Sequence, residues 1–136
     1  MARIEVTGLH ETLISMENIA NIPDSVMQAM MEAQADIVVE AQKRTASTML
    51  QGPYYRGGVA GGVSKGKFKR TKDGAEHYVV FKGTQHGTRI AEIAFINEYG
   101  KKGQPARPFI KTANEQAVGE ATEAAAKILH DWQANQ

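Results

Sequence analysis

Two long segments with helical spacing of their apolar residues constrain the fold of this chain more than any other feature. In each segment the apolar residues lie three or four positions apart, so they share one helix face. Proline is tolerated in a first helical turn, and Asp24 places a negative charge near the positive end of the first helix. The sequence therefore predicts a long helix from about Pro23 to Thr45 and a C-terminal helix opened by Pro108. The apolar stripes are Val26, Met30, Ala33, Ile37 and Ala41, and Ile110, Ala113, Ala117, Ala121, Ala124, Ile128 and Trp132.

The other regular elements are predicted to be short. An alternating run predicts a strand over residues 3–7, and apolar residues at helical steps predict a short helix over residues 9–19. Residues 78–81 and 90–96 are rich in strand formers and flank a glycine-containing turn, so we expect a β-hairpin. Because the odd- and even-numbered positions of residues 90–96 are both largely apolar, that strand is predicted to be covered on both faces.

Residues 52–74 differ in character from the rest of the chain. Glycine recurs through them, the helical pattern is lost, and no acidic residue precedes Asp73. Glycine and like-charge repulsion both oppose compact packing, so we expect a long, mobile, basic loop over about residues 52–74. A second polar loop is expected over residues 100–107. The basic residues of the long loop are Arg56, Lys65, Lys67, Lys69, Arg70 and Lys72.

Length and composition fit one folded domain. A chain of 136 residues can build one hydrophobic core, and 42% hydrophobic with 23% charged residues is typical of globular proteins. We expect residues 1–136 to form a single α+β domain, in which a small antiparallel sheet packs against the long helix and the C-terminal helix. The long basic loop should project from it. No apolar stretch is long enough to span a bilayer, so we expect a cytoplasmic protein when it is made, with no membrane contact.

The sequence contains no recognisable catalytic or metal-binding pattern. It lacks cysteine, and its histidines do not follow a metal-ligand spacing; His77 and His86 are interpreted as exposed. No serine lies in a nucleophile elbow, and the glycine-rich segment fails as a phosphate loop because Phe68 stands where serine or threonine is required. We therefore expect no catalytic, metal-binding or cofactor-binding residues and no enzyme, with a small hydrolase as the weakest alternative. The histidines are His10, His77, His86 and His130.

Three local signatures, taken in order along the chain, resemble one known family. The first is Val6-Thr7-Gly8-Leu9, followed by a short helix and then by a long helix that ends in Lys43-Arg44-Thr45-Ala46. The second is Phe95-Ile96-Asn97-Glu98-Tyr99-Gly100, and the third is Pro105-Ala106-Arg107-Pro108-Phe109-Ile110-Lys111-Thr112-Ala113. Over nearly the whole chain, they resemble the minor tail-component or neck family of long-tailed bacteriophages and prophages. Proteins of that family are implicated in tail completion and head–tail joining.

The resemblance implies a structural protein of the virion tail or neck, made in the host cytoplasm. It implies a homo-oligomeric ring, with a hexamer favoured, that contacts other phage neck or tail proteins. Its motif residues have structural roles: Gly100 permits a tight exit from a strand, and Pro108 fixes the entry to the last helix. Phe109 can seal the loop against the core. These motif residues are Glu98, Tyr99, Gly100, Pro108 and Phe109.

Two points stay open at the level of sequence. Glu98 could pair within the chain, with Lys101 or Arg107, or with a neighbouring subunit. The basic segment could be a solvated linker, a non-specific contact for genomic DNA, or a contact for an acidic protein face. The rival function is a small nucleic-acid-binding regulator that uses this segment. Because 16 basic residues are balanced by 15 acidic ones, that rival is less favoured than an architectural role.

Overall fold

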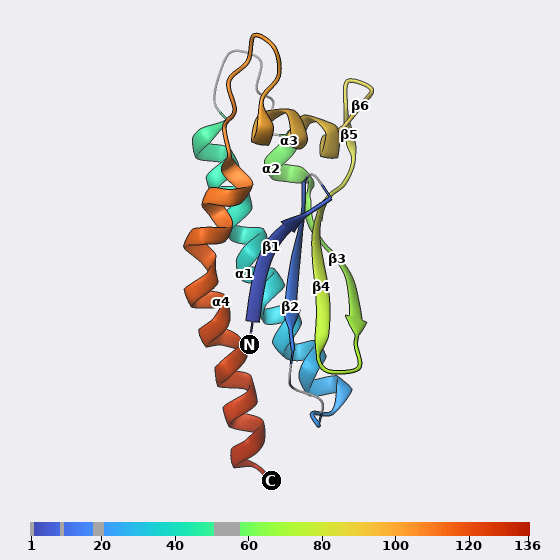
Figure 1. Ribbon diagram of the computed structural model, residues 1–136, viewed down its shortest axis with the longest axis vertical. Helices are drawn as coiled ribbons and strands as arrows, with labels where there is room; N and C mark the ends of the chain where they lie inside the picture. The colour runs from blue at the N-terminus through green and yellow to red at the C-terminus, as the bar shows by residue number, and fades with distance from the viewer. Residues whose placement is uncertain (1, 9, 18–20, 51–57) are drawn as a thin grey trace.

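The computed structural model describes residues 2–8, 10–17, 21–50 and 58–136. In this part of the chain, a four-stranded antiparallel sheet packs against two long helices, which confirms the predicted α+β class (Figure 1). The strands are β1 (Ala2–Thr7), β2 (Glu11–Met16), β3 (Val63–Arg70) and β4 (Ala75–Phe81), and the long helices are α1 (Asp24–Met49) and α4 (Phe109–Ala134). Near one end lie the short helices α2 (Gly58–Gly62) and α3 (Ile90–Tyr99) and a ribbon of β5 (Thr84–Gln85) and β6 (Thr88–Arg89).

The sheet has the order β1-β2-β4-β3, and every neighbouring pair is antiparallel. Along β4, buried residues alternate with half-buried ones, because α1 covers one face of the sheet. We call the opposite face the outer sheet face. Leu13 and Tyr78 are register partners on it, and Val80 follows Tyr78 along β4. Among the described residues, no helix covers the middle of this face, so its half-buried apolar side chains meet solvent.

The predicted long helix is confirmed as α1, but its buried face is rotated from the expected stripe. Met30 and Ala41 are buried as predicted, whereas Val26, Ala33 and Ile37 are only half-buried or at the margin. The reason is that α1 packs against both the sheet and α4, so two adjacent sides of the helix are covered. The buried residues are Met27, Met30, Met31, Gln34, Ala35, Val38, Ala41, Gln42, Thr45 and Ala46.

The C-terminal helix is confirmed as α4, which begins directly after Pro108. Ala113, Ala117 and Ala121 are buried, and their small side chains let α4 lie close along α1. Farther along, Ala125 is buried in place of the predicted Ala124, and Trp132 is half-buried against the core. The last turns of α4 therefore contribute less buried area than the sequence pattern predicted.

The predicted helix over residues 9–19 is wrong for its described part, which forms β2. Thr12, Ile14 and Met16 are buried on one face, while Leu13 lies on the other. A period of two therefore prevails over the helical spacing, because β1 and β4 supply backbone partners on both sides of the segment. Leu9 and Ile19, which carried the helical pattern, lie outside the described residues.

The predicted strand over residues 90–96 is also wrong, because this segment forms α3. Both edges of β4 are already taken by β2 and β3, so no backbone partner is left for a strand there. Ile90, Ala91 and Ala94 are buried, a spacing that a helix brings to one side. Of the predicted hairpin, residues 78–81 form a strand as part of β4, and the two-residue strands β5 and β6 pair within the segment between the two predicted strands.

The expected basic loop over residues 52–74 is wrong for residues 58–70, which form α2 and β3. Backbone pairing with β4 orders β3 despite its lysines, because those side chains point away from the core. Gly74 follows in the turn to β4, where an added Cβ would collide with the carbonyl oxygen of Met16. Residues 51–57 lie outside the described part of the chain. The second polar loop, over residues 100–107, is confirmed.

A buried polar cluster joins three elements of the core. The Gln42 side-chain amide of α1 donates to the Thr12 hydroxyl of β2 at 2.8 Å and to Oδ1 of Asn114 on α4 at 3.0 Å. The Asn114 amide donates in turn to Thr12 Oγ1 at 3.1 Å. Because buried polar groups are costly without partners, these bonds fix how the two helices sit against the sheet.

Candidate functional site

Strand β3 brings three of the predicted contact residues to the surface. Lys65, Lys67 and Lys69 alternate along the strand and are exposed, and Lys72 is exposed in the turn that follows. Lys65, Lys67 and Lys69 therefore stand on a strand at the edge of the sheet and not on a loop. Arg56 lies outside the described residues.

Two of the basic residues are engaged within the chain. Lys65 Nζ lies 2.9 Å from Asp36 Oδ1 on α1, and this hydrogen bond raises the pKa of the lysine. Arg70 Nη2 donates to the carbonyl oxygen of Ile22 at 3.0 Å, and its Nε lies 3.2 Å from Asp24 Oδ1. Arg70 thus anchors the end of β3 to the start of α1, so its first role is structural.

Lys67 and Lys69 border a hollow on the outer sheet face, whereas Lys72 does not line it. Its volume is about 780 Å³, and we call it the lysine-rimmed hollow. Tyr78, Val80 and Phe68 give it apolar surface, and a single acidic residue, Glu11, lies at its margin. Sequence reasoning missed Lys82, because only the return of β4 beside β3 brings it to the same site. The lining residues are Glu11, Lys65, Gly66, Lys67, Phe68, Lys69, Tyr78, Val80 and Lys82.

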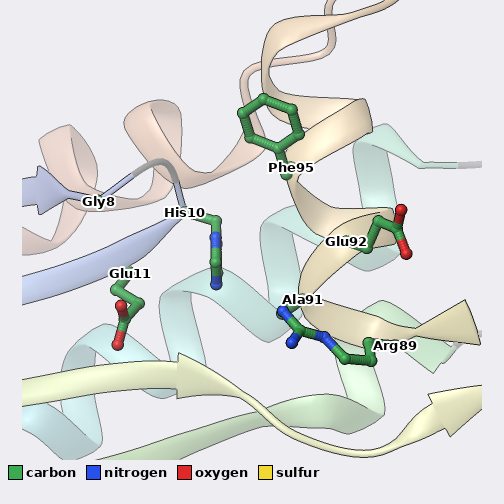
Figure 2. A pocket seen from close by; sticks show the side chains of 7 residues that line it. All are labelled: Gly8, His10, Glu11, Arg89, Ala91, Glu92 and Phe95. Carbon is green, nitrogen blue, oxygen red and sulfur yellow. The ribbon is translucent and has the colours of Figure 1, made fainter.

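A second hollow of about 590 Å³ lies between the β1–β2 turn and α3, and Figure 2 shows its lining side chains. His10 and Arg89 extend toward each other across it, whereas the Glu92 carboxylate points away. The His10 ring also packs near Phe81, with 6.5 Å between the ring centroids. Glu11 lines both hollows, so the two form neighbouring parts of one surface. The polar side chains that line this second hollow are His10, Glu11, Arg89 and Glu92.

Glu98 belongs to the interior of the fold. Its side chain sits at the end of α3 and is buried, with 5% of the residue exposed. The carboxylate accepts hydrogen bonds from the backbone N–H groups of Ile110 at 2.7 Å and Lys111 at 3.1 Å. It therefore caps the start of α4, where backbone donors lack partners in the helix. Burial raises the pKa of Glu98, and the two N–H bonds partly oppose that shift.

The neighbouring motif residues complete the connection between α3 and α4. Gly100 has a φ of +79°, and a Cβ there would lie 2.8 Å from the Ala106 nitrogen, so glycine is required. Phe109 is fully buried and meets Phe81 edge to face, with 5.9 Å between the ring centroids. Tyr99 is 49% exposed and packs beside Phe95. Because the element before Gly100 is a helix, the predicted strand-to-helix turn is corrected to a helix-to-helix turn.

The histidines do not gather into a site. His77, interpreted as exposed from the sequence, is buried at 3% exposure because β4 points it toward α1, and burial lowers its pKa. It packs against Phe68 at 6.1 Å between ring centroids. His86 is exposed in the β5–β6 turn, as predicted. Over the described ranges, no group of three histidine, aspartate or glutamate side chains is placed to hold a metal ion.

Comparison with known proteins gives no relative for this chain: no family model, curated protein or solved structure matches it. Within the described residues, none of the helices combines the length and hydropathy that crossing a bilayer requires.

Proposed function

We propose that this chain is an architectural subunit of the head–tail connection of a long-tailed phage or prophage. In this role, identical copies associate head to tail into a ring at the neck or tail end. The observation that carries the proposal is the uncovered outer sheet face, which combines half-buried apolar side chains with the lysine-rimmed hollow. Surfaces that join an apolar centre to a charged rim are typical of protein contacts. The sequence resemblance to neck proteins supplies the biological setting.

The arrangement of charged groups favours protein contact over chemistry. Neither of the two described hollows is lined by a serine or threonine. The buried hydroxyl groups of Thr12, Ser15 and Thr45 and the ring of His77 lie in the interior. Glu98, the acidic residue of the family-like motif, holds α4 in place. Among the described residues, Glu98 and the cluster of Thr12, Gln42 and Asn114 serve the fold, whereas the lysines around the hollow lie on an open surface.

The test is the mass and shape of the purified protein. We expect size-exclusion chromatography with light scattering to detect oligomers, and negative-stain imaging to show closed rings. In a phage that lacks the gene, heads and tails should be made but not joined. A protein that stays monomeric at every concentration, together with normal phage yield without the gene, would refute the proposal.

The second candidate is a nucleic-acid-binding regulator, favoured by Lys67, Lys69 and Lys82 around one hollow. Only a few phosphates could be neutralised by each copy, so duplex DNA binding should be weak and fall steeply with salt. Tight, sequence-selective binding in physiological salt, measured by fluorescence anisotropy, would promote this candidate above the architectural one.

A further inference from the structure

Charge is divided between the two layers of the molecule. Helices α1 and α4 together contain eight acidic and four basic residues, a formal charge of −4. The four strands of the sheet contain five basic and three acidic residues, a formal charge of +2. A subunit with unlike charge on its two sides is suited to pairing one side with the other side of a second copy.

The exposed positive charge of the sheet side is concentrated at the lysine-rimmed hollow. Lys67, Lys69 and Lys82 border it, and within the described residues none of the three forms an ion pair. Tyr78 and Val80 provide an apolar surface between them. An occupant of this hollow therefore needs an apolar group flanked by negative charge.

Helix α4 presents such a group on its outward side. Val118 is 40% exposed, one of only two large hydrophobic residues that are exposed in the described part of the chain. Glu115 lies one turn before it on the same side of the helix, and Glu123, five positions beyond, lies on the adjacent exposed side. Both are exposed, and neither forms an ion pair with another described residue. Gly119 and Thr122, which are also exposed beside Val118, are small enough to leave room for a neighbour to approach.

We infer that the outer sheet face of each subunit receives α4 of the next copy. Val118 of one copy packs over Tyr78 and Val80 of its neighbour. Glu115 and Glu123 lie against the lysines that rim the hollow. The contact joins two different surfaces, so it repeats from copy to copy and can close into a ring. This inference rests on the proposed function and names the surfaces through which the ring would form.

A second copy fits this face better than a nucleic acid does. Glu5, Glu11 and Glu76 also lie on the outer side of the sheet, so positive charge on this face is local and centres on the lysines around the hollow. A local positive site suits a few carboxylates better than a continuous run of phosphates, which would meet these glutamates. The apolar surface of Tyr78 and Val80 would gain little from a phosphate backbone, whereas Val118 would remove it from water. An acidic, partly apolar protein surface complements both features.

Paired charge reversals test the contact. Lys67→Glu with Lys69→Glu makes the sheet side acidic, and Glu115→Lys with Glu123→Lys makes the α4 side basic. Each double variant alone should self-associate at least about tenfold more weakly than the unmodified chain, because like charges then face each other. Circular dichroism should show an unchanged fold, since all four side chains are exposed.

Mixing the two variants in equal amounts should restore assembly. In the mixture, each contact joins either two unmodified surfaces or two reversed ones, and both combinations are complementary. The variants then alternate around the ring, which closes only with an even number of subunits. Lys101→Glu with Lys102→Glu, an equal change of charge in the exposed 100–107 loop, is the matched control and should assemble normally.

Engineered disulfides give an independent measure, because the chain has no cysteine of its own. A variant with Lys69→Cys and Val118→Cys should oxidise into a ladder of covalent oligomers on a non-reducing gel. Each single cysteine variant should give no ladder, because the two surfaces differ. Covalent dimers from a single variant would indicate a symmetric contact and overturn the inference.

The outcomes separate the two proposals. If the unmodified chain forms rings and both charge-reversed variants do so equally well, the inferred contact is wrong while the ring function stands. If the unmodified chain never self-associates and yields no disulfide ladder, both fail. If the Lys67→Glu and Lys69→Glu changes abolish DNA retention but leave assembly intact, the sheet face serves nucleic acid and the inference is overturned.

Discussion

Replacing Glu98 with alanine should destabilise the fold by removing the cap of α4. The buried carboxylate is the acceptor for the N–H groups of Ile110 and Lys111, at 2.7 Å and 3.1 Å. Alanine leaves the buried Ile110 donor without this partner, in the first turn of α4, where the helix itself supplies no acceptor.

The expected loss follows from these contacts. Removing a helix cap costs about 0.5–2 kcal/mol, and leaving a buried donor unsatisfied costs about 1–3 kcal/mol. These costs overlap, and relief of the buried charge offsets part of them, so we expect a decrease of about 2–4 kcal/mol in the free energy of unfolding. For a chain of this size, that decrease lowers Tm by roughly 10 °C.

Urea denaturation monitored by circular dichroism measures this change. Glu92→Ala is the matched control, because Glu92 is an exposed glutamate on the same helix and its loss should change stability by less than about 0.5 kcal/mol. If Glu98→Ala lowers the free energy of unfolding by no more than the control does, the carboxylate does not hold α4 and the prediction is refuted.

Three further changes probe other parts of the structure. Gln42→Leu should lower stability by about 2–4 kcal/mol in urea denaturation, since it removes both amide bonds of the buried polar cluster; a neutral result would mean that the cluster contributes nothing. Trp132→Ala should cost less than Phe109→Ala, for which about 3–5 kcal/mol is expected, because Trp132 is half-buried and Phe109 fully so; equal losses of Tm would contradict this. Because burial raises the pKa of Glu98, the folded state binds this proton more tightly than the unfolded state, so the contribution of Glu98 falls as pH rises from the usual glutamate range through the raised pKa. The difference in unfolding free energy between the unmodified chain and Glu98→Gln should show that fall, and a rise over the same pH range would reverse the assigned direction.

The sequence predicted the two long helices because their signals are local. Pro23 and Pro108 mark their starts, and helical spacing persists over many turns in both. The precise buried face of α1 was not predictable, since it depends on α4 and the sheet packing against it from two directions. The residues of a segment therefore decide whether it forms a helix, whereas the elements that pack against the helix decide which of its sides is buried.

The short elements were mispredicted because tertiary partners decide them. Leu13 and Met16 suggested helical spacing, but β1 and β4 turn the segment into a strand. Residues 90–96 have the composition of a strand, yet β4 had no free edge to offer them. Residues 63–70 lacked an apolar pattern, because their lysines lie on an edge strand, where exposed charge is usual.

The candidate site was predictable only in part. The lysines of β3 were identified from local charge, but their grouping with Lys82 and Tyr78 required the antiparallel pairing of β3 with β4. Arg70 was singled out for its charge, whereas its bonds to Asp24 and Ile22 depend on a contact across almost fifty residues. Charge patterns locate candidate residues, and topology decides which of them share a surface.

The inward position of Glu98 has a consequence for how chains like this one diverge. The recognisable motif around it is held by folding demands, because its carboxylate, Gly100 and Phe109 all serve the α3–α4 connection. Residues such as Lys67 and Glu115 are exposed, so their side chains contribute little to stability and can vary without loss of the fold. Two descendants of one ancestor could therefore keep the motif intact while exchanging their surface charges. If copies associate through the surfaces proposed above, each descendant would then recognise only copies of itself.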